Sequence, residues 1–206
     1  MAEIIQGSEE WFAMRVGKVT ASRISDIMAK GRNGEKSATR EKYKAELICE
    51  RLTGTKTEGF TTQAMADGVE RESVARSLYE AKFGVFVDEV AFVDHPTIPM
   101  SGASPDGTVA EDGLIEIKSP QAQAHLKHFK DGAPSNYLYQ MYWQMACTGR
   151  KWCDFVSYQP YFPDYLQLVV KRYHRDDEEI QRIESEVMKF LSEVNEEVNK
   201  LEKVKQ

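Results

Sequence analysis

A hairpin pattern in the middle of the chain, residues 104–120 (SPDGTVAEDGLIEIKSP), is the feature that most restricts the fold. Residues 115–118 alternate apolar and charged side chains, which is the two-residue period of a β-strand. The isoleucines of this strand would face a core, while Glu116 and Lys118 emerge together on the opposite face. The pattern therefore predicts an antiparallel hairpin that carries charged residues on one side.

The side of the hairpin on which Asp106 lies depends on the register of the two strands. A two-residue loop would turn Asp106 away from Glu116, because a shift of one residue reverses every side chain. A three-residue loop over residues 111–113 instead places Asp106 opposite Lys118 and on the side of Glu116. A bulge at Gly107 has the same effect. The last two cases bring two carboxylates and an ammonium group together.

Two carboxylates and a lysine at one place are consistent with two interpretations, exposed charges on a surface strand or a metal site that cleaves phosphodiester bonds. Hard divalent ions such as Mg²⁺ bind carboxylate and carbonyl oxygens and keep several waters. Such an ion offsets charge on a phosphate and lowers the pKa of a bound water. A lysine beside it orients or deprotonates that water, or neutralises the pentavalent intermediate. The spacing alone leaves both interpretations open.

Two polar residues on predicted helices are candidates to complete such a site. Glu70 shares a helical stripe with Ala66 and Val74, and is either an edge residue or a further oxygen ligand. Gln140 would hold the attacking water, although Gln140 and Gln144 are equally consistent with polar residues at a helix edge.

Other site patterns are incomplete or absent from the sequence. His125 and His128 lie three apart on a predicted helix, but no nearby Cys or acid completes a zinc set, so we interpret them as surface residues. The chain has no Gly-rich phosphate loop of the Walker type and no Gly-x-Ser-x-Gly elbow. The hairpin is the better candidate.

Periodicity and turn residues divide the rest of the chain into helices and strands. We expect helices at residues 8–15, 20–30, 39–52, 62–83, 121–129, 136–147 and 176–203, and further strands at residues 85–93, 152–160 and 165–174. This order predicts a single α/β domain over residues 1–206, with a mixed central β-sheet flanked by helices. The last helix is amphipathic, which indicates core packing, with a partner-facing role as the alternative.

The composition is that of a globular protein, with 41% hydrophobic and 29% charged residues among 206. No apolar run approaches the roughly 20 residues of a membrane span. The first residues, MAEIIQGSEEWF, do not have the pattern of a signal peptide. Three cysteines without Cys-x-x-Cys spacing indicate reduced thiols that fill the core. We therefore expect a protein of the cytoplasm.

The formal net charge of −6 argues against a protein coated with basic patches, but it does not exclude DNA as a substrate. An acidic protein that acts on DNA must gather its cations on one surface. The basic clusters in the sequence are residues 30–36 with Arg40, Lys42 and Lys44, and residues 127–130. Each cluster is equally consistent with a solvated loop or helix face.

Five segments, in order along the chain, resemble the phage lambda exonuclease family, the YqaJ-type viral recombinases of the PD-(D/E)XK nuclease superfamily. They are WFAMRVGKVTAS, DGVERE, SPDG, LIEIKSP and YLYQMYWQ. Five collinear segments are far more specific than one Glu-x-Lys. The resemblance implies a restriction-endonuclease-like core and favours the metal site over surface charges.

The resemblance also implies a role for individual residues. The implied metal ligands are Asp106, Glu116, the backbone carbonyl of Ile117 and, as the outer ligand, Glu70. Lys118 resembles the catalytic lysine, and Gln140 resembles the residue that positions the water. Arg15, Ser22 and Ser104 match a pocket that holds a terminal 5′-phosphate, where a guanidinium binds the phosphate in a bidentate manner and hydroxyls complete the pocket.

The implied function is Mg²⁺-dependent 5′-to-3′ digestion of one strand of linear double-stranded DNA from a 5′-phosphorylated end. The product would carry a 3′ single-stranded overhang for phage-type recombination by strand annealing. The resemblance further implies two Mg²⁺ ions, with Mn²⁺ as a substitute, a homotrimeric ring, a single-strand annealing protein as a partner, and a bacterial or phage-infected cell. The alternatives are a structure- or sequence-specific DNA endonuclease of the same fold and a non-catalytic DNA-end-binding protein.

Overall fold

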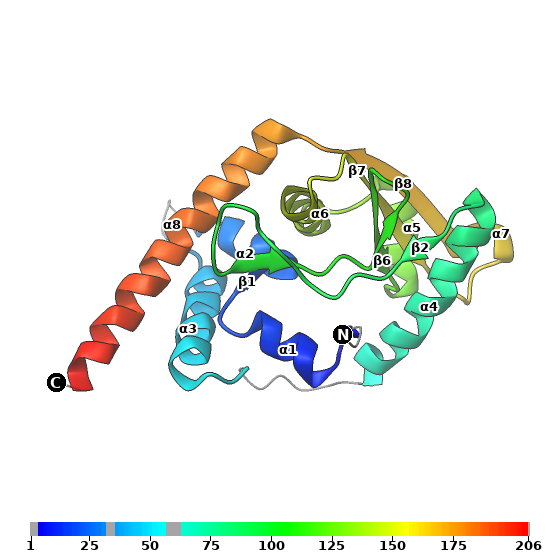
Figure 1. Cartoon of the computed structure of the whole chain (residues 1–206). Helices are drawn as coiled ribbons and strands as arrows, with labels where there is room; N and C mark the ends of the chain where they lie inside the picture. The colour runs from blue at the N-terminus through cyan, green and yellow to red at the C-terminus, as the bar shows by residue number, and fades with distance from the viewer. Residues whose placement is uncertain (1–3, 32–35, 57–62, 206) are drawn as a thin grey trace.

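In the computed structural model of the chain, residues 4–31, 36–56 and 63–205 are described. Figure 1 shows their arrangement. The helices are α1 (Glu9–Arg15), η1 (Ala21–Arg23), α2 (Ile24–Met28), α3 (Ala38–Thr53), α4 (Gln63–Phe83), α5 (Ala122–Asp131), α6 (Ser135–Thr148), α7 (Asp164–Gln167), α8 (Asp177–Glu202) and η3 (Lys203–Lys205). The strands are β1 (Val19–Thr20), β2 (Val87–Asp88), β3 (Val93–Asp94), β4 (Ser101–Ala103), β5 (Gly107–Val109), β6 (Gly113–Lys118), β7 (Trp152–Tyr158) and β8 (Leu168–His174).

The main sheet has five strands in the order β2-β5-β6-β7-β8. The β6–β7 pair is parallel and the other pairs are antiparallel, so the sheet is mixed. A smaller sheet has three strands in the order β1-β4-β3. Helix α6 contacts both sheets, through β3 and β4 of the smaller one and β7 of the main one. The predicted α/β class with a mixed sheet flanked by helices is confirmed.

Strand β6 is the centre of the main sheet and is covered on both faces. On one face Ile115 and Ile117 belong to the same buried cluster as Tyr79 of α4. On the other face Leu114 packs with Met141 of α6. The prediction that Glu116 emerges from the hairpin is therefore wrong, because α6 covers the face to which its side chain points.

The β5–β6 hairpin has the register that brings Asp106 to the side of Glu116. Gly107 pairs with Ile115 and Val109 with Gly113, so the three-residue loop covers residues 110–112, one position earlier than predicted. Asp106 consequently lies across from Glu116 instead of Lys118. Gly113 pairs with Trp152 of the neighbouring strand, and only glycine fits there because a Cβ would overlap the indole ring of Trp152.

Two local predictions differ from the structure. The single strand predicted for residues 85–93 is two short strands, β2 and β3, which belong to different sheets. Residues 89–91 leave the sheet between them, and the carbonyls of Val90 and Ala91 accept side-chain hydrogen bonds instead of strand partners. The helix predicted to start at Thr20 is divided into η1 and α2, and the Thr20 side chain does not cap it.

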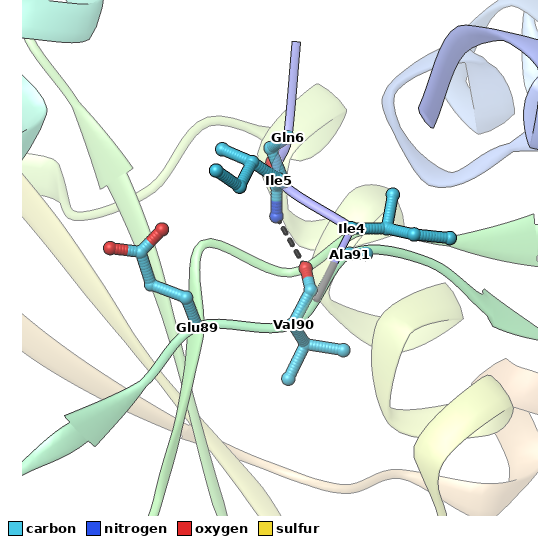
Figure 2. A pocket seen from close by; sticks show the side chains of 6 residues that line it. All are labelled: Ile4, Ile5, Gln6, Glu89, Val90 and Ala91. Carbon is cyan, nitrogen blue, oxygen red and sulfur yellow. Dashed lines mark hydrogen bonds between the residues drawn. The ribbon is translucent and has the colours of Figure 1, made fainter. Parts of the chain in front are cut away.

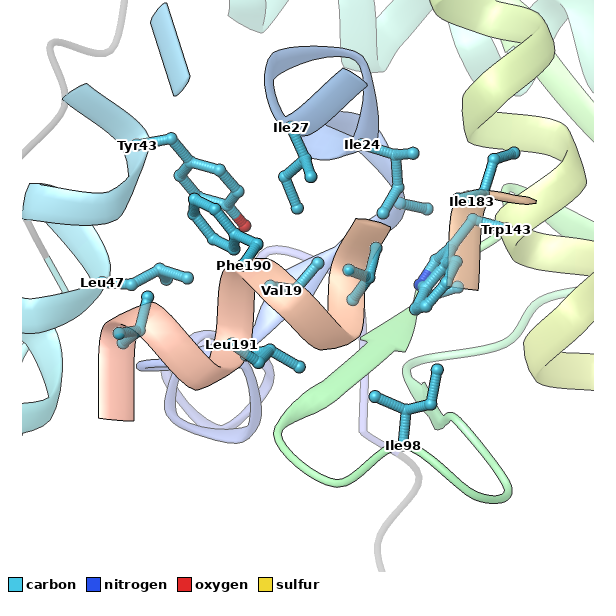
Figure 3. Close-up of a cluster of buried hydrophobic side chains, with 14 of the residues drawn as sticks. Val19, Ile24, Ile27, Tyr43, Leu47, Ile98, Trp143, Ile183, Phe190 and Leu191 are labelled. Atoms are coloured by element: carbon cyan, nitrogen blue, oxygen red, sulfur yellow. The ribbon is translucent and has the colours of Figure 1, made fainter. Parts of the chain in front are cut away.

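A second buried cluster joins the two ends of the chain (Figure 3). Helix α8 contributes apolar residues at helical spacing, namely Ile183, Val187, Phe190, Leu191 and Val194. They pack against α2, α3 and α6, and the Phe190 ring stacks on Tyr43 with 5.4 Å between centroids. Figure 1 shows α8 along the outer side of α2 and α3. The amphipathic helix predicted for residues 176–203 is confirmed, and its apolar face packs into the core.

The described residues form no helix with the length and apolar character that a membrane span requires. Cys147 and Cys153 are buried and Cys49 is exposed, and all three are free thiols. The prediction of thiols that fill the core is correct for two of the three.

Replacing Phe190 by alanine should lower the free energy of unfolding by about 3 to 5 kcal/mol, because the ring is fully buried between α8 and α3. Met188, two residues earlier on the same helix, is 53% exposed, so Met188→Ala should change the free energy by no more than about 0.5 kcal/mol. Urea denaturation followed by circular dichroism measures both. Equal losses in the two variants would contradict the orientation of α8 described above.

Candidate active site

The Glu116 carboxylate is fully buried and is surrounded by hydrogen-bond donors. Gln140 Nε2 donates to Glu116 Oε1 at 2.7 Å, and Gln144 Nε2 donates to Oε2 at 2.5 Å. The Lys118 ammonium forms an ion pair with Oε1. Both glutamines are buried, so the interpretation as helix-edge residues is wrong. A buried carboxylate requires such partners, because an unpaired charge away from water is very costly.

Asp106 lies beside this group, across the hairpin. Its Oδ2 accepts a hydrogen bond from the backbone N–H of Ile117 at 2.6 Å. Burial, and next the negative charge of Glu116, raise the pKa of Asp106 well above its usual range, while Lys118 opposes the shift. The structure thus brings Asp106, Glu116, Ile117 and Lys118 to one place.

Lys118 carries the positive charge of this group. Burial lowers its pKa, but the nearby carboxylates of Glu116 and Asp106 outweigh burial, so the pKa is raised overall. Its ammonium also lies 5.2 Å from the centre of the Tyr137 ring. The side chain therefore stays protonated at neutral pH in this arrangement.

The donor atoms at this place fit a hard divalent cation. Two carboxylates, from Asp106 and Glu116, are held together where burial disfavours their charges, and Lys118 supplies only one positive charge against them. All the candidate ligands are oxygens, which Mg²⁺ and similar ions prefer over soft donors. Within the described ranges no group of three or more His, Cys, Asp or Glu side chains forms a complete metal cage. Bound water or substrate oxygens would have to complete the coordination.

A third carboxylate near the centre comes from Glu72 of α4. Burial raises its pKa, and the charges of Glu116 and Lys118 act on it as well. Glu70, the residue expected from the sequence, is exposed. Residues two apart on a helix point about 200° away from each other, so Glu70 and Glu72 face different sides. The electrostatic contacts favour Glu72 in the outer position, and the assignment of Glu70 stays a prediction.

Arg76, one turn after Glu72 on α4, ties that carboxylate to the hairpin. Its Nη2 donates to Glu72 Oε1 at 2.9 Å and to the backbone carbonyl of Asp106 at 3.3 Å. Arg76 also forms an ion pair with Glu89. The arginine therefore fixes Glu72 relative to Asp106.

Arg15 contacts Ser104, two residues before Asp106, and lines a pocket together with Ser22. Arg15 Nη1 donates to Ser104 Oγ at 2.9 Å. Arg15 and Ser22 line one pocket of about 360 Å³ between α1, η1 and α3. Burial lowers the pKa of Arg15 to about 10, which leaves it charged at neutral pH. Ser104 is two residues from Asp106, so a single short turn connects the pocket to the carboxylates.

The N-terminal segment holds this turn in place. Gln6 Nε2 donates to the carbonyl of Pro105 at 2.9 Å and to that of Val90 at 2.6 Å, and Figure 2 shows the second of these bonds. Trp11 Nε1 donates to Ser104 Oγ at 3.0 Å and to the carbonyl of Ala91 at 2.7 Å. The turn between the pocket and the carboxylates is therefore fixed by donors from an element about 90 residues earlier.

The two histidines of α5 are buried, which contradicts their interpretation as surface residues. The Nδ1 atoms of His125 and His128 lie 2.9 Å and 3.0 Å from the same hydroxyl, Ser157 Oγ. His125 Nε2 lies 2.8 Å from the carbonyl of Leu166. Both imidazoles thus serve to anchor α5 to β7, and no zinc site results.

Three cations of the first basic cluster pair with two acids, Glu193 and Glu41. Glu193 of α8 accepts a bidentate pair of hydrogen bonds from Arg40, at 2.9 Å and 3.0 Å. Lys36 and Lys44 approach the same carboxylate, and the bond from Arg40 contributes most to lowering the pKa of Glu193 to about 2. Residues 32–35 of this cluster lie outside the described residues. In the second cluster Lys127 and Lys130 are exposed on α5.

Three residues that contact the site were not predicted to belong to it from the sequence, namely Gln144, Glu72 and Gln6. Gln144 has a local signal, since it lies one helical turn after Gln140 and shares its face. Glu72 has a similar signal in the Glu72–Arg76 pair at i, i+4. The contacts of Gln6 are with residues 84 and 99 positions away, and no local pattern reports them.

Comparison with known proteins gave one family and several solved structures. Residues 10–151 match the YqaJ-like viral recombinase domain. An alkaline exonuclease from Laribacter hongkongensis, LHK-Exo, is 50% identical, with a TM-score of 0.88 over 95% of this chain and 97% of that chain. The structure of LHK-Exo in complex with dAMP aligns over the same shares at 50% identity, with a TM-score of 0.89. The comparison with curated proteins gave no match.

A more distant structure shares the fold alone. A phage-related exonuclease from Haemophilus somnus 129PT is 15% identical, with a TM-score of 0.71 over 89% of this chain and 96% of that chain. The restriction-endonuclease-like fold predicted from the sequence is confirmed by the match to LHK-Exo. The family match covers more than half of the chain and includes the hairpin, α6 and the Arg15 pocket. The chain therefore belongs to the YqaJ-like viral recombinase domain family.

Proposed function

We propose that this chain is a Mg²⁺-dependent exonuclease that digests one strand of linear double-stranded DNA in the 5′-to-3′ direction from a 5′-phosphorylated end. The observation that carries the proposal is the short turn from Ser104 to Asp106, which joins a cationic pocket to a buried pair of carboxylates. A terminal phosphate in the pocket would bring the next phosphodiester bond to the carboxylates. The 50% identical relative is itself named an alkaline exonuclease, which supports the same class of reaction.

In this proposal Asp106 and Glu116, with the backbone carbonyl of Ile117, hold Mg²⁺, and Mn²⁺ is able to replace it. Glu72 or Glu70 would supply the outer ligand of a second ion, and we favour Glu72 for its contacts with Glu116 and Lys118. When bound, a divalent cation supplies positive charge beside the phosphate and favours ionisation of a water molecule there.

Lys118 and Gln140 are the residues that we expect to act directly on the reacting groups. The Lys118 ammonium, already aligned by Glu116, would donate to the phosphate oxygens as negative charge develops on them. Gln140 donates through its Nε2 to Glu116, so its amide oxygen is oriented away from that bond and can accept a hydrogen bond from the attacking water. Hydrolysis would break the bond from phosphorus to the 3′ oxygen of the end nucleotide, which leaves as a 3′ hydroxyl.

This direction of cleavage leaves a phosphate on the shortened strand. The new 5′ end is therefore again a ligand for the pocket formed by Arg15, Ser22 and Ser104. The opposite strand would remain as a 3′ single-stranded overhang, the substrate of strand annealing in phage-type recombination. A single-strand annealing protein is the proposed partner, and the cytoplasm of a bacterial or phage-infected cell is the proposed location.

We further propose that residues 1–206 act as one nuclease domain, with α8 as part of it, because α8 buries its apolar face against α2 and α3. The enzymatic alternative is an endonuclease of the same fold, which would cut closed circular DNA as well as linear DNA. The non-enzymatic alternative is a DNA-end-binding protein, which would bind linear duplex without cutting it. An exonuclease would cleave linear duplex but not closed circular duplex. An endonuclease would cleave both, and an end-binding protein would cleave neither.

Lys118→Ala should reduce the digestion rate of linear duplex by about 10²- to 10⁴-fold, because it removes the cation beside Glu116. Asp106→Asn should have a comparable effect, since the neutral amide lacks the negative charge that a carboxylate offers a divalent cation. Lys151→Ala is the control, because Lys151 pairs with Asp112 on the exposed surface. Release of nucleotides with Mg²⁺ is the measurement, with circular dichroism to verify folding. Normal digestion by folded Lys118→Ala protein would refute the catalytic assignment.

Arg15→Ala should slow digestion of 5′-phosphorylated duplex by about 10- to 100-fold, because it removes a charge-assisted, partly desolvated contact to the phosphate. Digestion of 5′-hydroxyl duplex should change much less, so the preference for the phosphorylated end should narrow. Arg182→Ala, which breaks a surface pair with Glu179, is the control and should affect both substrates little. If the unmodified protein shows no preference for a phosphorylated end, the pocket is assigned wrongly.

Light scattering should give three chains per particle in solution, as a homotrimeric ring requires. A ring would reconcile the net charge of −6 with DNA binding, since the cations of three chains can line one channel. The control is a dilution series, which reports the concentration at which the particle dissociates. A stable monomer with full activity would remove the channel from the proposal.

A further inference from the structure

The Arg15 pocket contains a second cation, Lys56, that no sequence motif identifies. Helix α1 carries two neighbouring aromatic rings, Trp11 and Phe12, in a T-shaped contact with 4.9 Å between centroids, and Phe12 lines the pocket. The Arg15 guanidinium lies 4.0 Å from the centre of the Trp11 ring, and the Lys56 ammonium lies 3.9 Å from the centre of the Phe12 ring. Both cations line the same pocket. Each is therefore positioned by a ring of the same helix.

The other two cations that line the pocket are already neutralised by acids. Lys18 pairs with Asp94 at 2.6 Å, and Arg23 pairs with Asp26 at 2.5 Å. Arg15 and Lys56 differ from them, because neither forms an ion pair with a carboxylate of the residues that the structure describes. Glu50 also lines the pocket and attracts both cations, but its carboxylate accepts a hydrogen bond from the N–H of Gly17 and, within the part of the chain that the structure describes, forms no salt bridge with either of them. Arg15 and Lys56 are thus the two positive charges of the pocket that face a ligand without a salt-bridged carboxylate.

These two charges act on each other. Burial, and next the charge of Arg15, lower the pKa of Lys56, while the charge of Glu50 opposes the shift. Burial also lowers the pKa of Arg15, as described above. Two like charges that lose water and repel each other destabilise the empty pocket, and an anion between them would offset both effects.

We propose that Lys56 is the second cation of the terminal-phosphate pocket, and that Arg15 and Lys56 together select the dianion of a terminal phosphomonoester over the monoanion of an internal phosphodiester. The proposal rests on the proposed function, in which this pocket holds a 5′-phosphate. A monoester carries close to two negative charges at neutral pH, whereas a phosphodiester carries one. Two unpaired cations match the first and leave an excess of positive charge with the second. The pocket would thereby recognise a strand end by its charge.

Lys56 should contribute less than Arg15 to binding of the terminal phosphate, and its contribution should depend on the charge of that phosphate. Its side chain is exposed and its ammonium is a point charge, whereas Arg15 donates a hydrogen bond to Ser104. Its loss should weaken binding of a dianion more than binding of a monoanion. Lys18 lines the same pocket with the same charge, but Asp94 already balances it, so its loss should not discriminate between the two ligands.

The test is equilibrium binding of short duplexes in EDTA, which removes divalent cations and prevents cleavage. Three duplexes differ only at the 5′ end, which carries a phosphate, a methyl phosphate diester or a hydroxyl. We expect the unmodified protein to bind the phosphate end more tightly than the methyl phosphate end. Lys56→Met should weaken binding of the phosphate end by about 3- to 10-fold and narrow its advantage over the methyl phosphate end, while Arg15 keeps the remainder of the preference.

Two further variants control for indirect effects. Lys56→Arg keeps the charge and should restore the preference for the phosphate end, whereas Lys18→Met should leave that preference as it is. If Lys56→Met keeps the full preference of the unmodified protein, the role of Lys56 is refuted, while the 5′-phosphate pocket itself stands. If the unmodified protein does not distinguish a phosphate end from a hydroxyl end, both the pocket and the role of Lys56 are refuted.

Discussion

The rest of the structure depends on the burial of one charged group, the carboxylate of Glu116. A carboxylate without contact to water is stable in a protein only when donors and positive charge surround it. Here the donors are two glutamines of α6 and the charge is Lys118, two residues along the same strand. These contacts fix the distance and rotation of α6 over the sheet. Removing any one partner would leave an incompletely compensated charge, so the same group that is suited to chemistry also constrains the packing.

The elements that local patterns determine were predictable from the sequence. Ser8 accepts a hydrogen bond from the N–H of Trp11 and starts α1 as its position suggested, and the apolar spacing of α8 matches its buried face. The face of Glu116 was not predictable in this way. The alternation in β6 assigns one face to the isoleucines, but only α6, which follows about 20 residues later, determines that the opposite face is also buried. The division of residues 85–93 between two sheets has the same cause, since the partner strands β4 and β5 come later in the chain.

The carboxylate pair and the Arg15 pocket differ in how well the sequence alone predicts them. The carboxylate pair follows from the hairpin register, and the correct side was already among the alternatives that loop length allowed. No periodic pattern in the sequence predicts the Arg15 pocket, because the hydrogen bond between Arg15 and Ser104 joins residues 89 positions apart. It was identified through the resemblance of whole segments to a family. Lys56 lies outside those segments, and its association with Arg15 is visible in the three-dimensional structure, where both residues line one pocket and Lys56 contacts Phe12.

The packing of α8 has a consequence for the order in which the protein acquires its structure during synthesis. Tyr43 and Leu47 form part of the wall of the Arg15 pocket, and Phe190 of α8 supports Tyr43 from behind. All the residues that line the pocket are translated well before α8. A nascent chain that has not yet released α8 from the ribosome therefore lacks the support for this wall, even though Arg15, Ser22 and Ser104 have all emerged. If the pocket has the proposed function, it would bind a DNA end only after the last helix has folded back onto the first ones.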